Sequence, residues 1–492
     1  MLDLPVRLDP SIRNQSKQVH AALRSAVVDG RLSPGLKLPS SRALADQLRV
    51  RRNTVVAAYE HLLSDGLVEA RHGAGTYVAA ELPGLPSASP AAAPDLEPIQ
   101  RTAFALGRTG ADALLLRRLG SSIRRRIVTA TSEELGYGDP RGSERLRSQI
   151  AHNLAASRGV RCDPSCVIVV SGVQHAIRLC VDALLSRGDA IWMEDPGYYA
   201  ARTTLSAAGM KLVPVPVDAE GIVVATGLRA DAAAKAAYVT PSHQFPTGVT
   251  MSMSRRVALL EWAHSAQSWV FEDDYDSEFR YAGPPLTALA GIGGERVIYI
   301  GTFTKTLFAS LRLAYLVLPP SVVGRVVAAR AAFDRFPPRF TQDAVAELMA
   351  DGTLAAHTRR IAKSYREARD VVAQVLTRAA CGTLRVVVPT QGLHLIAYLP
   401  RHVPQDVAIE IRRRAGVEAK LISETRIVPG EDDGFILGYS GFDIQELATA
   451  AERLGRAAGE IIGRQPAARS RSGARQIFGV ASTLSGKADE LA

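Results

Sequence analysis

The stretch Ile298-Tyr-Ile-Gly-Thr-Phe-Thr-Lys305-Thr-Leu-Phe-Ala-Ser-Leu-Arg312 is the most informative part of the chain. Its apolar run before Gly301 predicts a buried strand. Small hydroxyl residues and Lys305 follow this run, and Arg312 lies seven residues beyond the lysine. Another apolar run, at 268–271, leads into the acidic segment Phe271-Glu-Asp273-Asp-Tyr275. An amine, a carboxylate, a phenol and a guanidinium are therefore expected just after two predicted strands.

These groups match the three chemical handles of one cofactor. Lys305 can form an imine with an aldehyde, Asp273 can protonate a pyridine nitrogen, and Arg312 can hold a phosphate. Pyridoxal phosphate carries all three handles, and proteins bind it through a lysine and an acidic partner of the ring nitrogen. A surface lysine after a strand is the simpler interpretation of Lys305 taken alone. The cofactor is favoured by the ordered set Asp273, Tyr275, Thr302, Lys305 and Arg312.

The same residues resemble those of the fold type I aminotransferases. The segment Glu272-Asp-Asp-Tyr-Asp-Ser-Glu-Phe-Arg-Tyr281 is similar to the MocR/GabR branch of regulators. The resemblance implies a catalytic group of Lys305, Asp273 and Tyr275, in which Asp273 keeps the ring nitrogen protonated. Asp274 and Asp276 are expected to be solvated or to lie behind the site. The resemblance also requires a DNA-binding domain ahead of the aminotransferase-like part.

Residues 1–80 are predicted to form such a domain, a winged helix. Helical patterns cover 15–29, 40–48 and 51–64, and two strand-like runs flank a glycine-bearing tip within 67–78. Two short helices with a tight turn between them, the latter with polar residues at its start, fit a helix-turn-helix. Such a motif offers the start of its recognition helix to the major groove.

The pattern from Leu38-Pro-Ser-Ser-Arg to Arg-Asn-Thr-Val is similar to the GntR winged-helix family. Where that family has a small residue before Arg-Asn-Thr, this chain has Arg51, which adds a phosphate contact or alters base choice. A small helical domain with a solvated basic face is the alternative, and the agreement of helices, turn and wing argues against it. The resemblance implies DNA contacts by Ser41, Arg42, Arg51, Arg52, Asn53, Thr54 and His72.

Composition agrees with a DNA-binding protein of more than one domain. The 492 residues include 59 Lys+Arg and 49 Asp+Glu, a formal net charge of +10, which is compatible with a nucleic-acid partner. The four cysteines form no CxxC pair, so neither a zinc ribbon nor a disulfide framework nor another metal site is expected. Without an apolar signal core or an 18-residue apolar run, the protein is expected to be cytoplasmic.

Two segments are predicted to lie outside the folded domains. Residues 81–101 are rich in proline and alanine and are interpreted as a semi-extended linker. Residues 464–492 are rich in Ala, Ser, Arg and Gly, and we expect a mostly disordered tail or a weakly amphipathic helix near 474–484.

Residues 102–463 are predicted to form an α/β aminotransferase-like domain. Strand-like runs alternate with helical ones and lie at 167–170, 190–193, 237–240, 268–271, 297–300 and 314–318. This alternation indicates a mostly parallel central sheet, and the resemblance adds a small C-terminal α+β subdomain. Because ligands bind at the carboxyl ends of such strands, the candidate residues are expected to gather at one edge of the sheet.

The resemblance implies two further contacts to the cofactor phosphate. Ser171, Gly172 and Val173 follow the strand at 167–170 and match the phosphate loop, where free amides at a helix start bind anions. Tyr137 matches a tyrosine that reaches the phosphate of the other subunit, which implies a homodimer.

Contacts to the cofactor ring are implied in the same way. Tyr198, rather than Tyr199, matches the aromatic residue that stacks on the pyridine, and a tyrosine that merely packs its loop is the alternative. The loop at 240–248 matches an Asn-Pro-x-Gly motif, but Phe245 takes the place of the asparagine that bonds the ring hydroxyl. Tyr275 is then the main donor expected for that hydroxyl, and His243 is a weaker one.

These features predict a DNA-binding transcription regulator that senses pyridoxal phosphate, or an amino compound, through a Lys305 aldimine. The alternative is an active aminotransferase that carries a DNA-binding module. The matching C-terminal segment, 434–441, lacks the arginine with which aminotransferases grip a substrate carboxylate, and Arg426 is the nearest candidate. This departure favours a third possibility, a sensor of pyridoxal phosphate itself.

Overall fold

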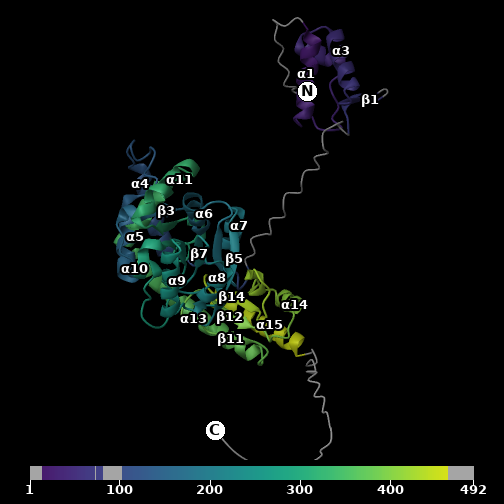
Figure 1. Ribbon diagram of the computed structural model, residues 1–492. Coiled ribbons are helices and arrows are strands. Elements are labelled where there is room, and N and C mark those ends of the chain that lie inside the picture. Colours follow the sequence, from purple (N-terminus) through teal and green to yellow (C-terminus); the bar gives the residue numbers. More distant parts are fainter. Residues whose placement is uncertain (1–13, 72–73, 81–101, 464–492) are drawn as a thin grey trace, which may run out of the picture. The chain divides into compact units, whose positions relative to one another are not determined.

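The computed structural model describes residues 14–71, 74–80 and 102–463. The chain divides into two compact units, Met1–Ile99 and Gln100–Ala492 (Figure 1). The predicted linker, the predicted tail and His72 lie outside the described residues. No helix in the described ranges combines the length and the apolar character needed to cross a membrane.

The N-terminal unit is a winged helix-turn-helix, as predicted. Its described elements are α1 (Gln15–Val28), α2 (Ser41–Leu48), α3 (Arg52–Ser64) and the antiparallel pair β1 (Val68–Arg71) and β2 (Gly75–Val78). Helix α2 begins after Ser40, whose hydroxyl accepts a hydrogen bond from the Ala43 amide at 3.1 Å and caps the helix. Arg49 ends α2 with a left-handed φ of 54°, and this turns the chain into α3.

The larger unit is built on an eight-stranded sheet of described residues with the order β3-β10-β9-β8-β7-β4-β5-β6. The strands are β3 (Val167–Val170), β4 (Ala190–Asp195), β5 (Lys211–Asp218), β6 (Gly221–Ile222), β7 (Ala236–Val239), β8 (Trp269–Asp274), β9 (Val297–Thr302) and β10 (Ala314–Val317). Strands β5, β4, β7, β8 and β9 run parallel, whereas β10 is antiparallel to both neighbours. The mostly parallel sheet predicted from the sequence is confirmed.

Helices cover both faces of this sheet (Figure 1). They are α4 (Ala113–Val128), α5 (Glu144–Ser157), α6 (Val173–Leu184), α7 (Tyr199–Ala207), α8 (Val224–Asp231), α9 (Met253–Ser265), α10 (Leu289–Gly293), α11 (Pro320–Phe333) and α12 (Arg339–Ala350). The long helix α13 (Thr353–Ala379) follows and leads to the small subdomain. Successive residues of a strand face opposite sides. Ile298 and Ile300 of β9 therefore pack with α6, α7 and α11, while Tyr299 packs with α4, α5 and α12.

A small C-terminal subdomain follows, also as predicted. Its described sheet, with the order β11-β12-β14-β13, is antiparallel and consists of β11 (Arg385–Val387), β12 (His394–Tyr398), β13 (Lys420–Leu421) and β14 (Gly434–Gly438). Helices α13, α14 (Gln405–Ala415) and α15 (Ile444–Ile462) share its apolar core. Asp195, at the end of β4, accepts hydrogen bonds from the amides of Ile427 and Val428 at 2.8 and 2.9 Å. This subdomain is thereby joined to the carboxyl edge of the large sheet.

Candidate functional site

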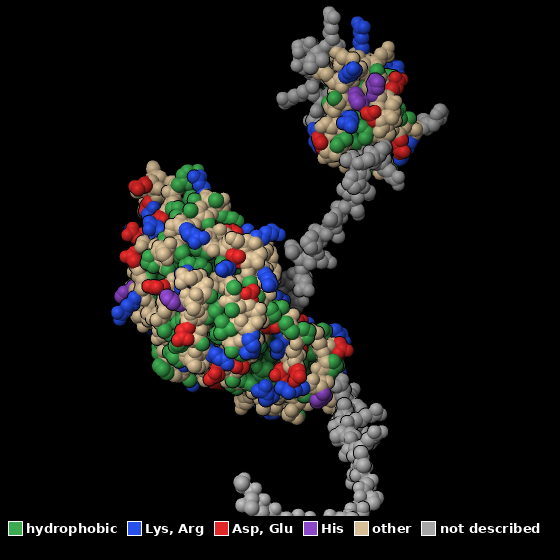
Figure 2. Space-filling view, viewed as in Figure 1, with side chains coloured by type: hydrophobic (Ala, Val, Ile, Leu, Met, Phe, Trp, Pro, Cys, Tyr) green, Lys and Arg blue, Asp and Glu red, His purple; other side chains and the backbone are tan. Residues whose placement is uncertain are grey.

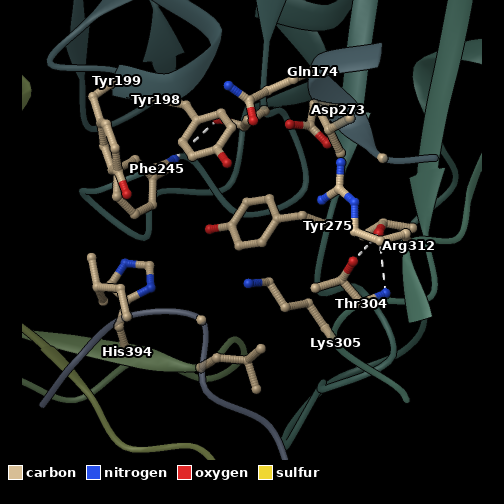
Figure 3. A pocket seen from close by; sticks show the side chains of 17 residues that line it. Gln174, Tyr198, Tyr199, Phe245, Asp273, Tyr275, Thr304, Lys305, Arg312 and His394 are labelled. Atoms are coloured by element: carbon tan, nitrogen blue, oxygen red, sulfur yellow. Dashed lines mark hydrogen bonds between the residues drawn. The ribbon is translucent and has the colours of Figure 1, made fainter. Parts of the chain in front are cut away.

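A cavity of about 230 Å³ lies at the carboxyl edge of the large sheet (Figure 3). It collects side chains from both sheets and from the segment that precedes α4. Predicted residues that line it are Gly172, Val173, Tyr198, Asp273, Tyr275, Thr302, Lys305 and Arg312. The structure therefore brings together residues that lie up to 140 positions apart (172 to 312) in the sequence.

Lys305 follows β9 and supplies an amine to the cavity. A Cβ on Gly107 would lie 3.1 Å from the Lys305 Nζ, so the glycine lets the chain pass close to the amine. Figure 3 shows this amine and the Tyr275 hydroxyl pointing into the same part of the cavity. Burial lowers the pKa of Lys305, against the charges of Asp276 and Asp273, which raise it. More of the amine is then in the neutral, nucleophilic form than in a surface lysine.

Asp273 supplies a buried carboxylate with one unused oxygen. It lies on β8 with the same orientation as Phe271, toward the face covered by α6 and α7. Its Oδ2 accepts a hydrogen bond from the Tyr238 hydroxyl. Its Oδ1 is buried and has no hydrogen-bond partner among the described residues. Burial raises the pKa of Asp273 to about 7, although the Tyr238 bond lowers it.

The neighbouring acids Asp274 and Asp276 lie behind the site, and their exposed fractions of 5% and 1% exclude the solvated alternative. Asp274 faces the opposite side of the sheet, where its Oδ2 lies 2.8 Å from the Arg158 Nε. Asp276 pairs with His243, whose Nδ1 lies 2.8 Å from the carboxylate. Alternation along β8 thus separates the cavity acid from the acid that joins the sheet to α5.

Gly172 and Arg312 form a cradle for an anion. Gly172 has a φ of 150° and precedes α6, whose first turn has no side-chain cap. A Cβ at Gly172 would lie 3.1 Å from the Arg312 Nη2. Thr302 and Thr304 line the same end, with their hydroxyl oxygens 3.0 Å apart. Free amides, the helix dipole and a guanidinium all favour a negative group here.

Aromatic rings form the wall opposite Lys305 (Figure 3). Tyr198 and Phe245 meet edge to face with their centroids 5.6 Å apart, and both line the cavity. Tyr199 also lines it, with the Lys420 Nζ 4.6 Å from its ring centroid. Because Phe245 has no polar side-chain atom, it cannot replace the hydrogen bond of an asparagine.

Four residues considered from the sequence do not line the cavity, and one of them is His243, whose ring is paired with Asp276 beside Tyr275. The Ser171 hydroxyl lies 2.9 Å from the His175 Nδ1. Tyr137 is 79% exposed, with its ring beside Phe336. Arg426 lies elsewhere and donates through its Nη2 to the Asp432 carbonyl at 3.4 Å.

Other lining residues were missed by sequence reasoning. They include Leu106, Gly107, Gln174, Thr304 and His394. The position of Gln174 at a predicted helix start was a usable signal, because it follows the predicted phosphate loop. Thr304 is one of the small hydroxyl residues noted between the predicted strand and Lys305. No pattern in the sequence indicated Leu106, Gly107 or His394, whose places in the cavity depend on how the small subdomain and the segment before α4 meet the sheet.

The predicted DNA contacts of the N-terminal unit gather at the starts of α2 and α3. Arg42, Arg51, Arg52 and Asn53 are exposed, and Ser41 and Thr54 are half-buried. The Arg52 Nε donates to the Ser41 hydroxyl at 3.4 Å, which joins the two helix starts. The face of this unit seen in Figure 2 mixes basic, acidic and histidine side chains.

A winged helix-turn-helix and an aminotransferase-type domain in one chain define a class of DNA-binding regulators. Residues 15–78 match the family of bacterial regulatory proteins named gntR. Residues 112–454 match the aminotransferase class I and II family.

Full-length relatives define the family more narrowly. The probable rhizopine catabolism regulatory protein MocR of Rhizobium meliloti is 34% identical over 446 residues, which cover 87% of this chain and 90% of that protein. The pyridoxine biosynthesis transcriptional regulator PdxR of Corynebacterium glutamicum is 30% identical over 460 residues, covering 91% of this chain and 97% of that protein. The chain belongs to the MocR family of GntR-type regulators and is a DNA-binding transcription regulator.

A solved structure supports the assignment of the larger unit. LysN, an alpha-aminoadipate aminotransferase from Thermus thermophilus, superposes with a TM-score of 0.66 and 25% identity. The match covers 73% of this chain and 92% of LysN, which was solved with N-(5'-phosphopyridoxyl)-L-leucine. The larger unit therefore has the aminotransferase fold.

Proposed function

We propose that this regulator binds pyridoxal phosphate in the cavity of its aminotransferase-like domain and that the bound cofactor, alone or with an amino compound, controls operator binding. The observation that carries the proposal is the meeting of three groups around one cavity. These are the Lys305 amine, the unused oxygen of Asp273 and the cradle of Gly172 and Arg312. A homodimer and a cytoplasmic location are part of the same proposal, and the exposed Tyr137 is available to a partner subunit.

The residues present fit the cofactor. The buried Asp273 Oδ1 needs a donor, and a protonated ring nitrogen would supply one. A phosphate fits the cradle because Gly172 has no Cβ to fill the space before Arg312. Lys305 would hold the aldehyde carbon and Tyr198 the ring face. When bound, the cofactor supplies a reactive carbonyl and an electron-withdrawing ring.

Ionisation at the site agrees with these roles. Burial lowers the pKa of Lys305, which favours a nucleophilic amine. Burial raises the pKa of Asp273 to about 7, and a cationic nitrogen opposite Oδ1 would favour the ionised carboxylate. Tyr275 would donate a hydrogen bond to the ring hydroxyl oxygen.

The cavity favours pyridoxal phosphate itself, or an amine, over an amino acid held by its carboxylate. Among the described residues that line it, the cationic side chains are those of Lys305 and Arg312. Both are assigned to the cofactor, and Arg426 lies outside. The relative PdxR is named for pyridoxine biosynthesis, which supports a regulator that responds to the cofactor.

An active aminotransferase is the second candidate, and the meeting of Lys305, Asp273 and Tyr275 favours it. Absorption spectra of the cofactor-loaded protein distinguish the candidates. We expect a visible band that Lys305→Ala removes without unfolding the domain. If the protein senses the cofactor itself, added amines should leave this band unchanged. If it senses amines, they should shift the band, and if it is an aminotransferase, it should convert them to products. A band unchanged in Lys305→Ala would exclude this lysine.

A further inference from the structure

A buried histidine–carboxylate pair lies directly behind Tyr275. His243 belongs to the loop after β7, and Asp276 follows β8. The His243 Nδ1 lies 2.8 Å from the Asp276 Oδ2, and both side chains are 1% exposed. The same Nδ1 lies 3.1 Å from the Tyr275 hydroxyl oxygen. Asp276, His243 and Tyr275 thus form a continuous chain from the interior to the cavity.

The carboxylate determines where the proton of this chain lies. An ionised carboxylate only accepts hydrogen bonds, so His243 must carry its proton on Nδ1 to bond Asp276. This N–H is shared with the Tyr275 oxygen, which then acts as an acceptor. The phenolic proton of Tyr275 is left to be donated elsewhere, and the cavity is on that side (Figure 3). A hydroxyl that accepts one hydrogen bond also becomes a better donor of another.

The other groups that face His243 do not compete for its Nδ1. His394 of β12 lies with its ring centroid 5.1 Å away, and its Nε2 is 2.9 Å from the Pro246 carbonyl. Burial lowers the pKa of His394 to about 4, so this ring is neutral near neutral pH. The His243 Nε2 is buried, has no hydrogen-bond partner among the described residues and faces Gly248, where a Cβ would lie 3.2 Å away.

Phe245 explains why such support is needed here. Its ring meets that of Tyr275 at 6.5 Å, edge to face, and offers no amide to the cavity. With no amide at position 245, the ring hydroxyl is assigned to the Tyr275 hydroxyl, which lines the same cavity.

We propose that His243 and Asp276 are positioning residues that hold Tyr275 as a hydrogen-bond donor toward the ring hydroxyl of pyridoxal phosphate. The inference rests on the proposed function, because it assigns a partner to one atom of the proposed cofactor. The His243–Asp276 pair would thereby set the pH at which the cofactor-loaded sensor changes its protonation state.

A pH titration of the visible band of the cofactor-loaded, full-length protein tests this inference. His243→Gln should raise the midpoint by roughly half to one pH unit, the shift that one hydrogen bond of ordinary strength supports. The reason is that a weaker Tyr275 donor leaves the ring oxygen more basic, so protons are held to higher pH. His243→Asn is measured alongside, and unfolding curves identify any variant that is misfolded.

A double-mutant cycle separates positioning from packing. Tyr275→Phe should raise the midpoint further, and His243→Gln should add nothing in that background, because its effect passes through the lost hydroxyl. An equal effect of His243→Gln in both backgrounds would overturn the inference.

His357→Gln is the matched control. His357 is also a buried histidine, with its Nδ1 2.9 Å from the Asp112 carboxylate, and it does not line the cavity. We expect it to titrate as the parent does. If the parent shows a visible band and both His243 variants titrate like it, this inference alone fails. If the parent shows no such band at saturating pyridoxal phosphate, the proposed function fails and this inference with it.

Discussion

At Asp273, the stability of the cofactor-free domain favours the neutral carboxyl, whereas the proposed chemistry needs the ionised carboxylate. Burial raises the pKa of this carboxyl from 3.8 to about 7. The unfolded chain therefore ionises Asp273 at a lower pH than the folded domain does. Between these two values the contribution of Asp273 to stability falls as pH rises, and above about 7 the full penalty remains. A cation at the unused Oδ1 would offset this penalty.

We expect Asp273→Asn to stabilise the cofactor-free protein at about pH 8 by roughly 1–4 kcal/mol, the range set by a shift of up to about three pKa units. The gain should shrink as pH falls toward 4, because Asp273 in the folded parent is then neutral, as the asparagine is in the variant. A carboxyl whose pKa is raised by folding loses its stability penalty in this way as pH falls. Denaturant unfolding at several pH values measures the gain. The same variant should bind pyridoxal phosphate more weakly.

Glu347→Gln is the control of opposite sign. Hydrogen bonds from Arg125 and Ser122 lower the pKa of Glu347 to about 2, so its contribution is present at neutral pH and is lost in acid. This variant should lose stability at about pH 8. A larger gain for Asp273→Asn in acid than in base would contradict the proposed ionisation of Asp273.

Arg52 is the residue of the N-terminal unit on which base recognition is expected to depend. It is exposed at the start of α3, and its Nε is held by Ser41. Arg52→Ala should weaken operator binding by about 1–3 kcal/mol and relax selectivity at one base pair, as expected for an arginine bidentate to guanine. Arg24→Ala removes an equal charge from α1 and should leave selectivity intact. Equal affinity and selectivity of Arg52→Ala and the parent at matched salt would show that α3 does not face the groove.

At the scale of elements, the start of α6 and the turn after β9 make one anion site only because Gly172 allows their close approach. Gly172→Ala should weaken binding of pyridoxal phosphate by about tenfold or more, since a displaced Arg312 loses charge-assisted hydrogen bonds worth roughly 1.5–3 kcal/mol. Gly188→Ala is the control, because Gly188 also has a positive φ, 91° against 150° at Gly172, but open space around it. Calorimetric titration of both variants gives the comparison, and equal losses would point to backbone strain alone.

The elements that the sequence predicted correctly are those with a strong local signal. The buried runs at β3, β8 and β9 are continuous and apolar, and their predicted positions are confirmed. Strand β5 was missed because Pro214 and Pro216 interrupt it. Because the two prolines are separated by one residue, their backbone nitrogens point to the same side of β5. That side faces away from β4, so the hydrogen bonds between β4 and β5 are kept. On that side, β6 pairs with Val217 and Asp218 and not with the prolines. Neither proline therefore replaces a residue whose N–H is needed in the sheet.

The site was predictable where a residue follows a recognisable strand and not where a distant element closes over it. Lys305 and Asp273 follow such strands. His394 reaches the cavity from β12 of the small subdomain, and Gly107 from the segment before α4. The residues next to His394 and Gly107 in the sequence form no pattern that distinguishes them from ordinary packing residues. The burial of Asp276 depends likewise on His243, 33 positions away.

At the scale of the whole molecule, ligand binding to the aminotransferase-like domain of a regulator must change the operator affinity of its DNA-binding domain. A ligand can shift an equilibrium between two arrangements only if it binds them with different affinity. Pyridoxal phosphate, alone or with an amine, is therefore expected to change operator affinity by roughly 5–150-fold, the usual range of allosteric coupling. The change should vanish in Lys305→Ala, because that variant lacks the amine that holds the cofactor.

Linkage makes this last prediction testable from both sides. If the cofactor changes operator affinity by a given factor, operator DNA must change cofactor affinity by the same factor. Titration of the visible band with and without operator measures one side, and operator binding with and without cofactor measures the other. Arg52→Ala provides the control, because operator DNA at a concentration that saturates the parent but not this weakened variant should change the cofactor affinity of the variant less. Identical operator curves for the cofactor-free, cofactor-bound and amine-treated protein would leave the cofactor with a structural or enzymatic role and would exclude a sensor.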